Sequence, residues 1–110
     1  MNVYEEAHNL EQAIKESEEY RQMKAAQQKM EQNPKVKHMV EDFRQKQIAV
    51  QAKQMMGEQV AQEAMQAVSD LYAVVMQDPS AAEYLQCEMR FGVMMQDVYK
   101  ILGDLMSFDQ

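Results

Sequence analysis

Residues 78–106 read DPSAAEYLQCEMRFGVMMQDVYKILGDLM, and apolar side chains return in this stretch at alternating spacings of three and four. That period places side chains on one face of an α-helix, and over several turns it is typical of a coiled-coil seam. The seam is interrupted only at Glu88 and consists of Tyr84, Phe91, Met95, Val98, Leu102 and Leu105. Further apolar residues lie beside it, at Met89, Val93, Met94, Ile101 and Met106. The pattern predicts a helix over about residues 79–106 whose apolar face is too wide for one neighbouring helix to cover.

Two dipeptides, Asn33-Pro34 and Asp78-Pro79, mark the starts of helices. Asparagine and aspartate are favourable N-cap residues, and proline suits the first helical position because its missing N–H has no partner there. Upstream of the first dipeptide, apolar residues recur mostly at spacings of three and four, at Val3, Ala7, Leu10, Ile14, Tyr20, Met23 and Met30. We therefore expect one helix over about residues 3–31, bent near Ser17, where a polar side chain interrupts the apolar face.

The centre of the chain carries a helix-weakening residue, Gly57. Glycine inside a helix costs up to about 1 kcal/mol relative to alanine. We expect the helix to break there, which gives helices over about residues 34–56 and 59–77, and the alternative is one long helix with a weak point. Because three glycines and two prolines leave little material for strand turns, the predicted fold class is all-α. We expect one domain over residues 1–110, a bundle of long antiparallel helices that oligomerisation completes.

The last two helices are expected to hold a self-association surface. Burial of each large apolar side chain contributes about 1.5–3 kcal/mol, so leaving several uncovered would forfeit much of a total stability of about 5–15 kcal/mol. We assign the core or the oligomer interface to Tyr84, Phe91, Met94, Met95, Val98, Leu102, Leu105, Leu71 and Val75. The predicted partner is a further copy of the chain, as a homodimer or higher oligomer, with other proteins as a second possibility.

The expected location is the cytoplasm. The longest apolar run is the six residues from Leu71 to Met76, whereas a membrane-spanning helix needs about 20. The first residues have neither the basic nor the apolar segment of an export signal, and the single cysteine, Cys87, excludes an internal disulfide. We therefore expect no membrane partner.

Charge is distributed in blocks, with an acidic start, a basic centre and an acidic end. The net charge of −7 argues against general binding to nucleic acid, because phosphate contacts need a local excess of lysine and arginine. The basic segment 35–53 is a possible weak contact for an anionic partner such as RNA, through Lys35, Lys37, Arg44 and Lys46. We favour the interpretation that this block pairs with the acidic blocks, within one chain or between copies.

Few residues have the chemistry of a catalytic or metal site. Glu5 and His8 have the spacing found in di-iron helix bundles, but such a site needs a second pair and two more glutamates. Cys87 has Arg90 one turn away, while the adjacent Glu88 opposes formation of a thiolate. We expect a non-enzymatic protein without catalytic residues, metal or cofactor. A metal or iron–sulfur sensor assembled between chains, through Glu5, His8 or Cys87, is the alternative.

The order and spacing of several segments resemble the YlbF/YmcA-like family of small helical bacterial proteins, most closely its YheA-like branch. The resemblance runs nearly end to end and is carried by Ile14-Lys-Glu-Ser-Glu-Glu-Tyr20, Asn33-Pro34 followed by Phe43, Gly57-Glu-Gln-Val60, and Asp78-Pro79 ahead of Tyr84-Leu85 and Glu88. It implies an all-helical, self-associating protein of a Gram-positive bacterium. Relatives are linked to competence, sporulation and biofilm regulation, and some form complexes that bind iron–sulfur clusters and influence messenger RNA processing. The relatives that bind clusters supply cysteines, whereas this chain has only Cys87. The resemblance therefore assigns neither ligands nor a cofactor to this chain.

Overall fold

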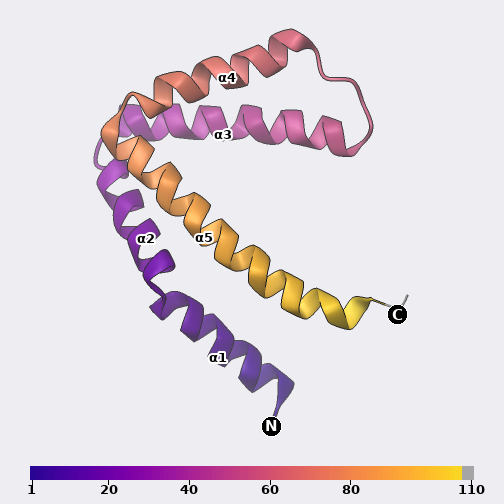
Figure 1. The fold of residues 1–110 in the computed structure, drawn as a ribbon. Helices are drawn as coiled ribbons and strands as arrows, with labels where there is room; N and C mark the ends of the chain where they lie inside the picture. The colour runs from indigo at the N-terminus through magenta and orange to yellow at the C-terminus, as the bar shows by residue number, and fades with distance from the viewer. Residues whose placement is uncertain (108–110) are drawn as a thin grey trace. The chain divides into compact units, whose positions relative to one another are not determined.

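The structure is a computed structural model that describes residues 1–107, and those residues form helices and no strands. In chain order the elements are α1 (Val3–Glu16), α2 (Glu18–Glu31), α3 (Pro34–Met55), α4 (Gln62–Met76), α5 (Pro79–Gly103) and a 3-10 helix, η1 (Asp104–Met106) (Figure 1). The predicted all-α class is confirmed. Within residues 1–107, no helix has the length and apolar character needed to cross a bilayer.

The chain divides into two compact units. Unit 1 consists of Met1–Gln27 and Tyr84–Gln110, and unit 2 is the central segment Gln28–Glu83. Unit 1 therefore contains α1, most of α2 and most of α5, while unit 2 contains α3 and α4. The expectation of a single domain stays a prediction.

Both proline-marked helix starts are confirmed. The Asn33 side chain accepts a hydrogen bond from the Lys35 N–H at 3.1 Å, and Pro34 opens α3. Asp78 caps α5 more fully, because one carboxylate oxygen accepts from the Ser80 N–H at 3.0 Å, the Ser80 hydroxyl at 2.7 Å and the Ala81 N–H at 3.0 Å. These bonds satisfy N–H groups that a helix start leaves without intrahelical partners.

The predicted single helix over residues 3–31 is wrong, since it is two helices separated by Ser17. This residue has extended backbone angles, and its hydroxyl donates to the Ile14 carbonyl at 2.6 Å while accepting from the Tyr20 N–H at 3.2 Å. One side chain thus ends α1 and caps α2. Serine competes with the helical backbone for hydrogen bonds, which explains why the expected bend is a break.

Gly57 ends α3, as expected. Its φ of +75° lies in the left-handed region. The Gly57 N–H donates to the Gln54 carbonyl at 3.1 Å and the Glu58 N–H donates to the Lys53 carbonyl at 3.0 Å, which is the Schellman pattern. The next helix begins at Gln62 rather than near residue 59, because the chain stays extended at Ala61, which has no capping side chain. The predicted last helix also ends earlier, at Gly103, where η1 follows.

Replacing Gly57 with alanine should lower the free energy of unfolding by about 1–2 kcal/mol, because a Cβ disfavours the left-handed backbone. An added Cβ has no atom within 4 Å, so the cost is conformational and not a clash. Gly92→Ala is the matched control, because Gly92 lies inside α5 with the same free space and alanine favours a helix by about 0.5–1 kcal/mol. Urea unfolding followed by circular dichroism measures both. A Gly57→Ala protein as stable as the wild type would contradict the assigned turn.

The core of unit 2 forms around the hairpin of α3 and α4, which run side by side in opposite directions (Figure 1). Val36, Val40 and Phe43 on α3 and Val75 on α4 are buried, and the rings of Phe43 and Tyr72 lie 5.7 Å apart. Met30 and Ala81 are also buried. An ion pair between Lys29 and Glu83, 3.4 Å long, joins the two ends of the unit.

The Asp78 cap should make folding stability depend on pH. The Ser80 hydroxyl and then the Ala81 N–H lower the pKa of the Asp78 carboxyl below its ordinary value, against the opposing effect of burial. A carboxyl with a lower pKa in the folded than in the unfolded state stabilises the fold above pH about 4, and that contribution is lost as pH falls through the lowered pKa. Asp78→Ala should cost about 1 kcal/mol at neutral pH and less in acid.

Asp78→Asn is the control for that experiment, because it keeps a capping oxygen and removes the charge. Urea unfolding of the three proteins at neutral pH and at pH about 3 gives the comparison. If Asp78→Ala is equally destabilising at both pH values, the ionised cap does not contribute the pH dependence.

Candidate functional site

Unit 1 has almost no buried apolar core. Among its described residues only Ala26 and Cys87 are buried, and both are small. The rings of Tyr20 and Phe91 pack with their centroids 5.7 Å apart, yet both residues remain half-buried. Large apolar side chains of this unit are exposed along α1, α5 and η1, namely Val3, Tyr4, Leu10, Met89, Val93, Tyr99, Ile101, Leu102, Leu105 and Met106. The helices of the unit therefore leave many of its large apolar side chains uncovered.

An open apolar groove lies between α1 and α5. One part, with a volume of about 340 Å³, is lined on α1 by Leu10 and Ile14 and on α5 by Val98 and Leu102. A second part of about 430 Å³ continues to Val3 and Met1. Ala7, Leu10 and Leu102 line both parts, so we treat them as one feature, the α1–α5 groove.

The rim of the α1–α5 groove is charged, while its floor is apolar. Glu11 and Lys15 line it and form an ion pair of 3.7 Å. Glu6 lines the end near the N-terminus. Such an arrangement, with apolar side chains at the centre and charged side chains around them, is typical of a protein interface.

The residues assigned from sequence to the core or interface divide between the units. Those on α5 and η1 lie in unit 1, where Tyr84, Phe91, Met94, Met95 and Val98 are half-buried and Leu102 and Leu105 are exposed. The other two lie on α4 in unit 2, where Leu71 is half-buried and Val75 is fully buried. Of the assigned set, Met95, Val98 and Leu102 line the α1–α5 groove.

The association surface was predicted in the C-terminal half, whereas the groove in the structure is also lined by α1. Ala7, Leu10 and Ile14 form the opposite wall of the groove. Their spacing of three and four was visible, and it correctly indicated one helical face. What the spacing could not indicate is that this face and α5 leave a groove between them.

The basic residues singled out on α3 do not form one uniform face. Lys35 and Lys37 are exposed at the start of the helix, Arg44 is half-buried, and both Asp42 oxygens accept from the Lys46 ammonium at 3.0 Å. The Asp42 carboxylate therefore offsets part of the charge that an anionic partner would meet. Phe43, on the same helix, is buried, so its ring is not available to stack on bases.

The candidate metal ligands do not assemble within the chain. His8 is exposed and contacts Glu11 at 3.5 Å, one turn beyond it, rather than Glu5. The Cys87 sulfur is buried and accepts a hydrogen bond from the Arg90 guanidinium at 3.2 Å. Over residues 1–107, no three histidine, cysteine or acidic side chains converge as metal ligands would. With Cys87 as the single cysteine, these residues do not fit an iron–sulfur cluster held by one chain.

Comparison with known proteins places this architecture among small bacterial proteins. A family model described as "Control of competence regulator ComK, YlbF/YmcA" matches residues 3–107. A UPF0342 protein of Symbiobacterium thermophilum is 37% identical over 107 residues, covering 97% of this chain and 96% of its own. A UPF0342 protein of Desulfitobacterium hafniense is 38% identical over 104 residues, covering 94% and 84%.

One solved structure has the same fold. It is described as a protein of unknown function (DUF964) from Bacillus stearothermophilus, and it superposes with a TM-score of 0.79 at 23% identity. The match covers 94% of this chain and 91% of that one.

Proposed function

The chain belongs to the YlbF/YmcA family, which is linked to control of the competence regulator ComK, and on this premise we propose that it is a regulatory protein that acts by binding other polypeptides. It is non-enzymatic and works in the cytoplasm. Its first partner is a second copy of itself, bound through the α1–α5 groove. The observation that carries the proposal is the near absence of a core in unit 1, where Ala26 and Cys87 alone are buried among the described residues.

The energetic reason is the cost of leaving large apolar side chains in water. Each one that becomes buried contributes about 1.5–3 kcal/mol. Covering half of the ten exposed apolar residues of α1, α5 and η1 would contribute about as much as the whole stability of a typical domain, about 5–15 kcal/mol. Association therefore stabilises unit 1 as well as joining the copies.

A two-fold arrangement suits this surface. In such an interface both copies use the same surface patch. That patch must therefore contain both a groove and the side chains that fill the groove of the other copy. Ile101 and Leu105 project as exposed apolar side chains on the same stretch that carries Leu102 of the groove wall. We propose that this stretch of each copy fills the groove of the other.

Light scattering coupled to size-exclusion chromatography tests the proposal at micromolar concentration. We expect a mass of twice 12.8 kDa or a higher multiple. A particle of 12.8 kDa would overturn it.

The same measurement in 1 M salt separates this mode of association from pairing between acidic and basic blocks, because the Debye length falls to about 3 Å at 1 M salt. Apolar association persists there, whereas association through charge is lost.

A further inference from the structure

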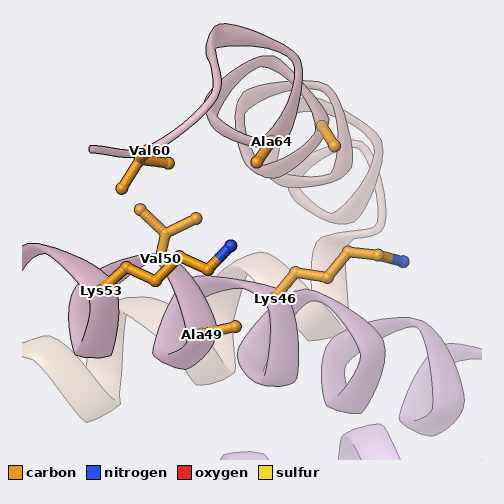
Figure 2. A pocket seen from close by; sticks show the side chains of 7 residues that line it. Lys46, Ala49, Val50, Lys53, Val60 and Ala64 are labelled. Carbon is orange, nitrogen blue, oxygen red and sulfur yellow. The ribbon is translucent and has the colours of Figure 1, made fainter. Parts of the chain in front are cut away.

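Unit 2 contains a second apolar depression, between the end of α3 and the start of α4. Its volume is about 170 Å³, and we call it the α3–α4 hollow. Figure 2 shows Val50 on α3 pointing across the gap towards Val60, with Ala64 on the far side, and Ala49 also lines the hollow. It exists because small side chains meet there. The methyl groups of Ala49, Ala64 and Ala67 do not fill the space between two helices that elsewhere bury Phe43 and Val75.

The volume of the hollow indicates what it can hold. Sites for cofactors and metabolites usually enclose about 300–1,000 Å³, well above this value. A cavity of about 150 Å³ accepts a benzene molecule. One leucine- or phenylalanine-sized side chain therefore matches the hollow, whereas a typical metabolite does not. Protein interfaces commonly use such single anchors in fitted pockets.

Of the two lysines at the mouth of the hollow, Lys53 indicates the charge of its occupant. Lys46 is held by both oxygens of Asp42 at 3.0 Å. Lys53 also lines the hollow, and no side chain within residues 1–107 forms an ion pair or hydrogen bond with its ammonium group. In Figure 2 the Lys53 side chain runs past Val50 towards the space below Ala64, while Lys46 extends away from Val50. A carboxylate beside the anchor would pair with the exposed Lys53 ammonium.

We propose that the α3–α4 hollow is a docking site for an acidic helical segment of another protein. The segment inserts one large apolar side chain between Ala49 and Ala64 and places a carboxylate, one helical turn away, against the Lys53 ammonium. Complementary charge brings the segment to the site and orients it, and the fit of the anchor gives selectivity. This assignment does not depend on self-association through the α1–α5 groove.

The test uses the full-length chain and a designed helical peptide of about 15 residues, near the shortest length at which isolated helices persist. The peptide has a single leucine, glutamates one turn on either side and an otherwise polar sequence. Fluorescence anisotropy measures its affinity, and methyl NMR of Ala49, Val50 and Ala64 reports where it binds. We expect replacement of the leucine with serine to weaken binding by about tenfold or more.

Two protein variants separate a specific contact from general attraction to a basic helix. Lys53→Gln should weaken binding about three- to fivefold, the effect of losing an exposed ion pair. Lys35→Gln removes the same charge from the start of the same helix, outside the hollow, and should change the affinity little. Ala64→Leu fills the hollow and should abolish the dependence on the peptide leucine, provided that circular dichroism shows an unchanged helix content.

Three outcomes would overturn the proposal. The first is equal binding of the leucine and serine peptides, and the second is an equal loss in Lys53→Gln and Lys35→Gln. In the third, phenylbutyrate shifts the same methyl signals at lower concentration than the peptide does, which would make the hollow a small-ligand site. The Leu102→Asp protein is expected to bind the peptide as the wild type does. A failure of peptide binding can therefore be distinguished from a failure of self-association.

Discussion

Leu102→Asp is expected to give a particle of 12.8 kDa at micromolar concentration, where we expect the wild-type protein to be a dimer or a higher oligomer. Leu102 lines both parts of the α1–α5 groove and is 49% exposed in a single copy, so a carboxylate there stays hydrated until a second copy covers it. Burial of an unpaired carboxylate in an apolar setting costs about 3 kcal/mol or more, which corresponds to a loss of affinity of about a hundredfold or more.

The control for this prediction is Gln96→Asp. It introduces the same charge on the same helix, at an exposed position that does not line the groove. Light scattering should give the wild-type mass for the control and the single-chain mass for Leu102→Asp. Phe91→Asp does not separate association from folding, because Phe91 packs against Tyr20 and its loss would disturb unit 1 itself. If Leu102→Asp retains the wild-type mass, the groove is not the association surface.

Phe43→Ala is expected to lower the free energy of unfolding by about 3–5 kcal/mol. Phe43 is 4% exposed, and its ring lies 5.7 Å from that of Tyr72 across the α3–α4 hairpin. Truncation removes the apolar burial, the contact between rings and the filling of space at once. For a chain of this size the melting temperature should fall by about 15 °C or more.

Ile48→Ala is the matched control, because Ile48 lies on the same helix and is 54% exposed. It should change the free energy of unfolding by less than about 0.5 kcal/mol. Urea and thermal unfolding should be compared at equal protein concentration, since association stabilises the folded state by mass action. A loss below about 1 kcal/mol in Phe43→Ala would contradict the buried position of this ring.

The ends of most helices were predictable from local sequence. Asn33 and Asp78 each precede a proline and act through hydrogen bonds to N–H groups two or three residues away. Gly57 acts through its own backbone angle. Signals of this kind depend on neighbours within one turn, so they are visible without knowing which helices meet.

Ser17 shows the limit of such reasoning. The interruption of the apolar face was evident, but a polar residue on a helix can tilt, kink or end it. The outcome depended on the serine hydroxyl bonding the Ile14 carbonyl and the Tyr20 N–H together, which is a matter of geometry. Spacing alone does not distinguish these cases.

The α1–α5 groove and the α3–α4 hollow depended on residues far apart in sequence. Leu10 and Leu102 belong to opposite ends of the chain, yet they line the same groove. Ala49 and Ala64 are favourable helix residues in any context, and they leave a hollow only because α3 and α4 place them opposite each other. Neither feature has a signature within a single helix.

Period and composition were sufficient to establish that this chain is helical, where its caps lie and that its apolar surface is wide, because each depends on contacts within a few residues. The pairing of helices decided the rest, including the small core of unit 1, the groove beside Leu102 and the exposed Lys53 at the mouth of the hollow. An apolar face is a property of one helix, whereas the part of it that stays uncovered depends on every element that packs against it.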